Sequence, residues 1–448
     1  MKAESKASNS DLPLVNKNAA GIDIGSREHY VAVPSDRSEK SVRSFQTFTS
    51  DLYSLANWLK ECKIDTVAME STGVYWIPVF QILEEKGFKV YLVNAKHVKN
   101  VPGRKSDVSD CQWIQRLHSF GLLSASFQPD ALTRELRTYL RQRDGLVRYT
   151  TAHIQHMQKS LTQMNIQLHN VISDITGESG MAIIRAIIRG ERNPDELVKL
   201  CKRGLKNSPD VIKKSLEGNY LDEHIFTLTQ AVELYDFYQK QILECENKIT
   251  ELLSKFPDQE IKDRKVDDTP LKQKKKKNKI SPEIREHLKR LTGIDLTQID
   301  GFNTLTAVTI ISEVGLDMSK WKTEKHFTSW LGLAPNNSIS GGKILKSGTK
   351  KIKSRASRAL RQAAQTLIRS QSYLGAYHRK MRYKLGSGKA NVATARKLAI
   401  LFYNLLKNGT EFKDLGIDYF ETKFRERNIA NLTKRALDLG FTIVPSPS

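Results

Sequence analysis

The chain has few cysteines and no long apolar run. Its 448 residues include four cysteines, and no two of them form a C-x-x-C pair. This scarcity argues against a zinc finger and a disulfide framework, and it fits a reduced, intracellular setting. No apolar stretch reaches the ~18 residues of a membrane span, and the first 18 residues lack the apolar core of a signal peptide. We therefore expect no membrane partner, and a flexible tail over residues 1–18.

Acidic residues are absent from one long part of the chain. No Asp or Glu occurs from Lys325 to Thr410, whereas 16 Lys and Arg fall between Lys343 and Lys397. The whole chain has 72 Lys and Arg against 49 Asp and Glu, a formal net charge of +23. Because an ordinary solvated surface mixes both signs, this segment favours contact with a polyanion such as nucleic acid.

Apolar periodicity divides the chain into regions. Strand-like runs alternate with helical spacing over residues 19–130, which predicts an α/β domain. Apolar residues recur every three or four positions over residues 131–257, which predicts long helices paired as a coiled coil. A polar segment rich in lysine, residues 258–284, is predicted to be a linker. A mainly helical, basic domain is expected over residues 285–410, with a helix-hairpin-helix-like segment around Gly301, followed by a tail over residues 411–448.

Four carboxylates stand at positions that suggest metal chemistry. Asp23 lies inside one apolar run and Glu70 closes another, while Asp107 and Asp110 are three residues apart at an expected helix start and share a face. An isolated buried carboxylate is costly, so a bound cation is a natural partner for such a group. Mg²⁺ or Mn²⁺ would accept these hard oxygen ligands and assist phosphodiester chemistry. The plainer alternative is that Asp107 and Asp110 only complement a helix dipole.

A serine beside two glycines opens the basic region. Ser340 precedes Gly341 and Gly342, which would let the backbone approach a phosphate closely, and a serine there suggests a nucleophile that meets DNA. Ser338 is a rival two residues away, and a polar turn is the plain alternative for both. Tyr373, Tyr377 and Tyr383 interleave with basic residues and are candidates for base stacking. The residues predicted to contact phosphate are Lys343, Lys346, Lys350, Lys351, Lys353, Arg355, Arg358 and Arg361.

Two blocks of sequence phrases resemble a known family. The order of the acids resembles a RuvC-like nuclease fold of the ribonuclease-H type. The phrases GIDIGS, AMESTGVYW, VYLVNAKHVKN and GRKSDVSDCQWIQRL are similar to the N-terminal domain of the DEDD transposases of the insertion-sequence one-ten family. The phrases IDGFNTLTAVTIISEVG, WLGLAPNNSISGGK and SRALRQAAQ resemble its second domain. The resemblance covers roughly residues 19–170 and 290–400 in the family's order, and two independent blocks are more specific than one.

The resemblance implies an activity and a set of partners. It implies a transposase, related to the Piv-type DNA invertases, that cuts and rejoins DNA for an insertion sequence. It places the nucleophilic serine at Ser340 and the metal ligands at Asp23, Glu70, Asp107 and Asp110. It also implies guidance by a structured noncoding bridge RNA, and a homo-oligomer (a dimer or tetramer) in which the acids of one subunit meet the serine of another. Such an enzyme is expected in bacterial or archaeal cytoplasm, at the nucleoid.

Two other functions are compatible with the residues. The first is a structure-specific DNA nuclease of the junction-resolving kind, which would use the four acids and water without serine chemistry. The second is a nucleic-acid scaffold in which the acids are structural. A covalent protein–DNA adduct would separate the transposase from the nuclease, and metal-dependent cleavage would separate both from the scaffold.

Overall fold

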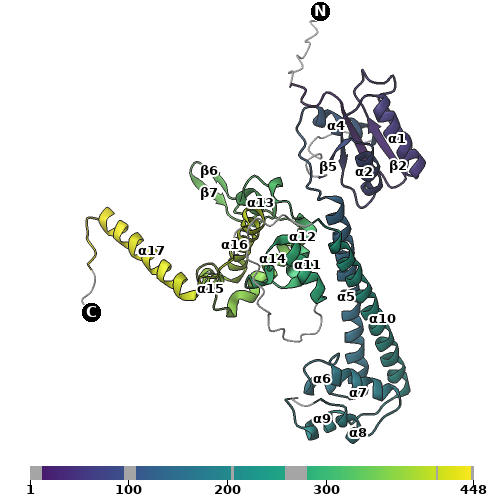
Figure 1. Cartoon of the computed structure of the whole chain (residues 1–448), viewed down its shortest axis with the longest axis vertical. Helices are drawn as coiled ribbons and strands as arrows, with labels where there is room; N and C mark the ends of the chain where they lie inside the picture. Colours follow the sequence, from purple (N-terminus) through teal and green to yellow (C-terminus); the bar gives the residue numbers. More distant parts are fainter. Residues whose placement is uncertain (1–12, 95–106, 203–205, 258–279, 410–411, 445–448) are drawn as a thin grey trace, which may run out of the picture. The chain divides into compact units, whose positions relative to one another are not determined.

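The chain forms two compact units, residues 1–128 and 129–448 (Figure 1). The structure, a computed structural model, describes residues 13–94, 107–202, 206–257, 280–409 and 412–444. Each unit has a core of its own. Within these ranges, no helix is both long and apolar enough to cross a membrane.

The first unit is built on one mixed five-stranded sheet. Its order is β3-β2-β1-β4-β5, in which β2 is antiparallel to β1 and β3, whereas β4 and β5 continue parallel to β1. This α/β arrangement is compatible with the expected RuvC-like domain. The strands are β1 (Ala19–Ile24), β2 (Glu28–Ala32), β3 (Val42–Gln46), β4 (Thr66–Glu70) and β5 (Lys89–Val93), and the helices are α1 (Thr49–Glu61), α2 (Trp76–Glu85) and α4 (Asp107–Ser119).

The two faces of this sheet are covered differently. Ile22 and Met69 point into the larger core, which α1 and α2 complete. The opposite face carries Ala68 and lies under α4, whose Ile114 is buried in a smaller apolar cluster. Because side chains alternate along a strand, residues next to Ile22 and Met69 belong to the α4 face.

Gly21 lets α4 pass directly over β1. A Cβ atom at Gly21 would lie 2.2 Å from the backbone nitrogen of Gln115 and 2.5 Å from the carbonyl oxygen of Cys111. Neither backbone atom can move without shifting the helix, so only glycine fits. The crossing fixes where α4 begins relative to the end of β1.

The segment that enters β1 is anchored. The backbone nitrogens of Val15 and Asn16 both donate to the carbonyl oxygen of Ser119 at 2.9 Å, and the carbonyl oxygen of Asn18 accepts from Asp65. Residues 15–18 had been assigned to a flexible tail, and here they hold the end of α4 to the sheet. The polar sequence of this segment gave no sign of these hydrogen bonds, because their backbone partners are distant in the chain.

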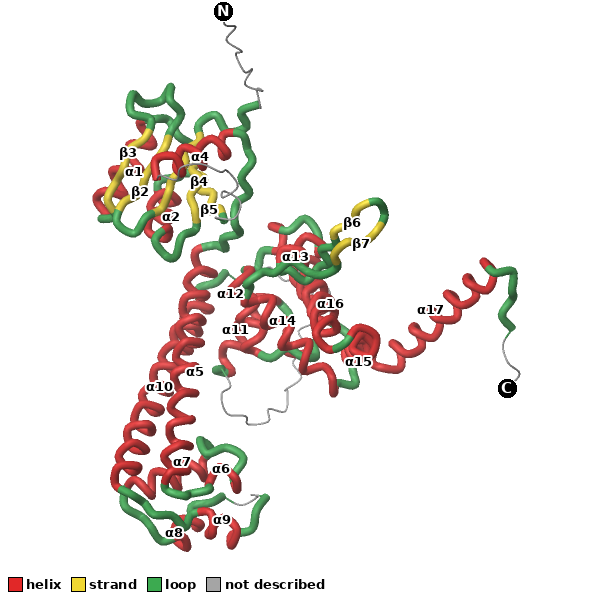
Figure 2. Tube along the Cα trace, turned by 180° about the vertical axis from the view of Figure 1, so that it is seen from behind, coloured by secondary structure: helices red, strands yellow, loops and turns green. Residues whose placement is uncertain are grey.

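Two long helices form the middle of the second unit. Helices α5 (Ala131–Gln163) and α10 (Asp222–Ser254) have 33 residues each and run antiparallel, with contacts from Arg143–Glu246 to Ser160–Thr227 (Figure 2). Short helices pack at one end of the pair around Leu161 and form a separate apolar core. They are α6 (Leu168–Val171), α7 (Glu178–Ile188), α8 (Pro194–Lys199) and α9 (Pro209–Ser215).

The rest of the second unit is mainly helical and contains one β-hairpin. Phe327 and Phe402 are fully buried and stack in its core. Helix α11 begins at Pro282, inside the segment 258–284 that had been assigned to a linker, and the lysine run there lies outside the described residues. The helices are α11 (Pro282–Thr292), α12 (Thr304–Val314), α13 (Glu324–Trp330), α14 (Arg355–Thr366), α15 (Tyr373–Leu385), α16 (Ser387–Asn408) and α17 (Gly416–Asp438), with 3-10 turns η1 (Leu296–Gln298), η2 (Met318–Lys320) and η3 (Leu367–Arg369); the hairpin strands are β6 (Ser338–Ser340) and β7 (Lys343–Lys346).

Candidate active site

Asp23 and Glu70 are placed by the register of two parallel strands. The pairing of β1 with β4 runs up to Ile22 and Met69, and each acid is the next residue of its strand. Parallel strands end at the same edge of a sheet, so the two carboxylates lie side by side on the face that α4 covers. Buried apolar neighbours hold both strands, so these two acids sit on a rigid support.

Asp107 and Asp110 come from the first turn of α4, and electrostatics places them beside Asp23. The pKa of Asp23 is raised to about 6, first by burial and then by the charges of Asp107, Asp110 and Glu70, in that order of size. Burial, followed by the charge of Asp23, also raises the pKa of the Cys111 thiol to about 12. The structure therefore brings together all four acids that the sequence singled out.

Among the described residues, no basic side chain forms an ion pair with any of the four acids. A structural acid in such surroundings would ordinarily have an arginine or lysine partner, because unpaired buried charge is costly. A cluster of like charges without a counter-charge is instead the arrangement expected of a cation site.

The acids approach one another without already enclosing an ion. Over the ranges that the structure describes, no three acidic, His or Cys side chains stand close enough to ligate one metal. The effect on Asp23 is still real, because charge acts over longer distances than a coordination bond. Asp107 is exposed and Glu70 is half-buried, so both side chains have room to turn inward. The four carboxylates supply hard oxygen ligands suited to a divalent cation.

Ser340 lies at the tip of the hairpin in the second unit. It pairs with Lys343 across a turn made of Gly341 and Gly342, whose φ angles of 54° and 75° favour glycine at both positions. Every residue of β6 and β7 is exposed, including Ile339 at 62%. The serine hydroxyl is therefore freely accessible, at the end of a strand and next to the two-glycine turn.

Two segments of the chain match models of known protein families. Residues 20–166 match a DEDD transposase model of the IS110 type, and residues 295–379 match a model described as "Transposase IS116/IS110/IS902 family". The chain belongs to the IS110 family of DEDD transposases. No curated protein matches the sequence. DNA is therefore a partner of this transposase, and DEDD transposases typically use a divalent metal ion.

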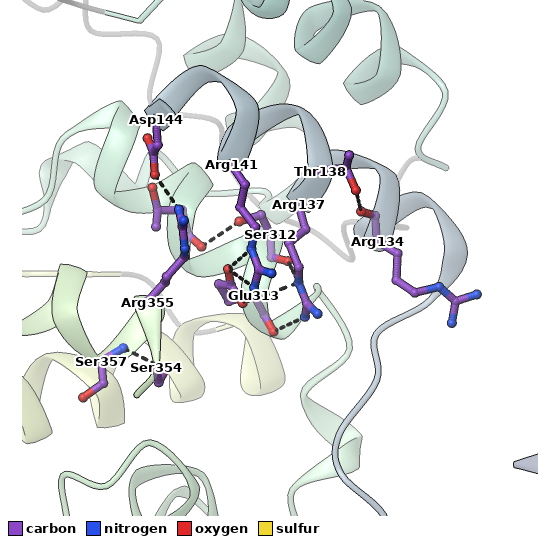
Figure 3. Close-up of polar contacts among 11 residues, drawn as sticks. Arg134, Arg137, Thr138, Arg141, Asp144, Ser312, Glu313, Ser354, Arg355 and Ser357 are labelled. Carbon is purple, nitrogen blue, oxygen red and sulfur yellow. Dashed lines mark hydrogen bonds and ion pairs between the residues drawn. The ribbon is translucent and has the colours of Figure 1, made fainter. Parts of the chain in front are cut away.

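The basic residues predicted to contact phosphate differ in whether they form ion pairs within the protein. The five lysines of the predicted set are exposed, and none of them has an ion-pair partner among the described residues. Arg355 is engaged, because its Nη1 lies 2.7 Å from Oδ2 of Asp144 on α5 (Figure 3). With Arg358, this pair lines a groove of about 280 Å³ between α12 and α14. Phosphate contact by Arg355 stays a prediction and would require exchange of the Asp144 partner.

A second set of arginines in the transposase fixes α12 to α5. Arg137 donates to the carbonyl oxygens of Ser312 and Glu313 at the end of α12, and Arg141 bonds the Glu313 carboxylate at 2.9 Å (Figure 3). Cations at a helix C-terminus satisfy its open carbonyls and favour its dipole. These arginines consequently have a structural role, which charge counting did not reveal.

Sequence reasoning missed two features of the transposase that position its chemistry. The hairpin had a recognisable signal, because Gly341-Gly342 separates two short segments that contain β-branched isoleucines, Ile339 and Ile344. The contact of Gly21 with α4 had no such signal, because its partners Cys111 and Gln115 lie about 90 residues further along the chain.

Proposed function

We propose that this transposase cuts and rejoins DNA with a metal-bound carboxylate site and a serine nucleophile. The metal would be Mg²⁺ or Mn²⁺, held by Asp23, Glu70, Asp107 and Asp110. The observation that supports this best is the raised pKa of Asp23, which reflects burial beside three other acids, none of them ion-paired to a basic side chain in the described part of the chain. Such a cluster is unfavourable by itself, and a divalent cation would remove the repulsion.

Each acid has a distinct part in this proposal. Asp23 and Glu70 come from rigid strand ends and would fix the position of the ion, whereas Asp107 and Asp110 would close on it from α4. When bound, a divalent ion supplies charge stabilisation to the phosphate oxygens during displacement. The crossing at Gly21 keeps the two sets of ligands on the same face.

Ser340 would act as the nucleophile. Its Oγ forms a bond to the phosphorus while one P–O bond of the DNA strand breaks, and the departing DNA hydroxyl takes up a proton as the serine proton passes to solvent. Attack by a DNA hydroxyl on the phosphoserine reverses the exchange and releases Ser340. The energy of the phosphodiester bond is conserved, so rejoining needs no added cofactor.

We further propose a structured noncoding bridge RNA and a homo-oligomer as partners. The exposed lysines around Ser340 would suit any phosphate backbone. The hairpin also exposes apolar side chains, with Leu345 at 72% and Ile344 at 60%, and a lone two-stranded hairpin is only marginally stable in water. A second subunit or a nucleic acid that covers the hairpin would account for both features.

A covalent adduct tests the serine assignment. Labelled DNA ends of the element are incubated with the protein, its RNA and Mg²⁺, and adducts are resolved on a denaturing gel. We expect an adduct with the wild type and with Ser338→Ala, and none with Ser340→Ala. Metal-dependent cleavage that persists in Ser340→Ala without any adduct would contradict the proposal and favour the junction-resolving nuclease.

A further inference from the structure

Helices α15, α16 and the start of α17 lie next to one another (Figures 1 and 2). A cavity of about 500 Å³ lies among their side chains. Its wall includes Tyr373 from α15, Lys397 from α16 and Tyr419 from α17. Leu374 and Ile400 add apolar surface, so the cavity combines aromatic faces, aliphatic floor and a cation. It lies apart in sequence from the hairpin of Ser340.

The two tyrosines leave aromatic surface available. Their ring centroids lie 6.4 Å apart at an angle of 45°, so neither ring covers the face of the other. Tyr419 is 42% exposed. This spacing is that of a direct aromatic pair, so a planar guest would stack on the cavity side of the pair and bury ring surface that is now open.

Lys397 is a cation without a carboxylate partner among the described residues. Its Nζ lies 4.7 Å from the ring centroid of Tyr377 and 5.9 Å from that of Tyr373. Burial, and then the charge of Arg427, hold the pKa of this lysine below its usual range. Half-buried positive charge with another cation nearby favours an anionic guest.

We infer that this cavity binds one unstacked nucleotide of a single-stranded nucleic acid, with the base against Tyr373 and Tyr419 and its phosphate near Lys397. Stacking on aromatic rings is available to every base, which suits recognition without sequence preference. Asn404 lies in the wall and offers an amide to a base edge, whereas Asp414 accepts from the backbone nitrogen of Tyr373 through its Oδ1. The inference rests on the proposed function, because it assumes an enzyme that handles unpaired strands.

A peptide from a partner protein fits the cavity less well. Helices α15 and α16 contain no acidic residue and carry Arg379, Lys380, Arg382 and Arg396, whereas α17 carries charges of both signs. The excess of positive charge favours a polyanion over a basic peptide. RNA and DNA strands present the same base and phosphate chemistry, so either can supply the guest.

The test compares a tyrosine of the cavity wall with an exposed tyrosine outside it. A fluorescent single-stranded oligonucleotide, in one DNA arm and one RNA arm, is titrated with the nucleic-acid-free full chain. Tyr419→Leu should weaken binding about 5- to 150-fold in at least one arm, the range expected for loss of one stacked base. Tyr419→Trp should retain binding. Tyr149→Leu is the control, because Tyr149 lies on α5 outside the cavity wall and is 58% exposed.

Photocrosslinking gives a second readout. Oligonucleotides that carry a halogenated uracil should crosslink to Tyr373 or Tyr419, and mass spectrometry locates the adduct. Equal affinities of Tyr419→Leu and Tyr149→Leu in both arms, with crosslinks only elsewhere, would overturn the inference and leave a protein segment as the occupant. Because Ser340→Ala leaves the cavity intact, loss of the serine adduct with retained tyrosine crosslinks separates this inference from the proposed catalytic function.

Discussion

Replacing Asp23 by asparagine should stabilise the N-terminal unit at neutral pH while it abolishes DNA cleavage. The carboxylate has a folded-state pKa of about 6 against an ordinary value of 3.8, because burial and three neighbouring acids disfavour its charge. Asparagine has almost the same shape and no charge. The substitution therefore removes the repulsion and leaves the packing of β1 unchanged.

The sign and size of this effect follow from linkage. A pKa raised on folding means that the folded state binds the proton more tightly, so the stability gained is complete below about pH 3.8 and is lost as pH rises through about 6. At about 1.4 kcal/mol per pKa unit, the loss has a ceiling of about 3 kcal/mol. Solvent screening of this partly exposed group reduces the expected gain to about 1–2 kcal/mol.

Calorimetry of the full chain in chelator measures the gain. A small domain shifts its melting temperature by roughly 4–8 °C per kcal/mol, so Asp23→Asn should melt several degrees higher near pH 7.5 and match the wild type near pH 4. Hydrogen exchange of peptides from β1 and β4 assigns the transition to this unit. Asp36→Asn is the matched control, because the Asp36 side chain is 74% exposed.

Added Mg²⁺ supplies the second half of the experiment. A ligand that binds only the folded state stabilises it by about 2.7 kcal/mol at 100 times its dissociation constant. The wild type should gain more from Mg²⁺ than Asp23→Asn, which lacks one ligand. A variant that melts at or below the wild-type temperature in chelator near pH 7.5 would refute the electrostatic reasoning.

Two further substitutions test the contacts that hold α4 over the sheet and α5 against α10. Gly21→Ala should displace α4 and abolish cleavage, because the new Cβ would meet backbone atoms at 2.2–2.5 Å. Reduced protection of α4 in hydrogen exchange would show the displacement. Gly348→Ala is the control and should behave as wild type, because the space around Gly348 is open. Arg143→Ala should destabilise the α5–α10 pair by about 3–5 kcal/mol in denaturant unfolding, because it leaves the buried Glu246 charge unpaired. A double Arg143→Met, Glu246→Leu variant should recover most of that loss; recovery of none would contradict the reasoning.

The local sequence pattern was sufficient to predict the strands that carry Asp23 and Glu70. The apolar run around Asp23 and the run that ends at Glu70 became neighbouring strands, because buried parallel strands read as continuous apolar sequence. The acids then met at one edge as a consequence of strand polarity. Their grouping could be predicted before the sheet order was known.

Features set by distant contacts could not be predicted in this way. Arg355 and Asp144 are separated by 211 positions, and the sequence around neither residue indicates that they pair. The same holds for Arg137 and the end of α12, 175 positions away. A basic residue in an acid-free segment therefore looks available for phosphate, although tertiary structure has already given it a partner.

The acids and the serine are held by different physical means. Asp23 and Glu70 are fixed by strand pairing over a core, and α4 is held above them by backbone contacts at Gly21. Ser340 depends on a two-glycine turn and a short hairpin whose residues are all exposed. Rigid strand ends under Asp23 and Glu70 suit the binding of an ion with demanding geometry, because misplaced ligands weaken coordination, and Asp107 and Asp110 would turn toward the ion from α4. In the proposed mechanism, an exposed serine on a hairpin tip suits a group that must reach a phosphate held elsewhere, so assembly of the site requires delivery of the hydroxyl as well as closure of the α4 acids.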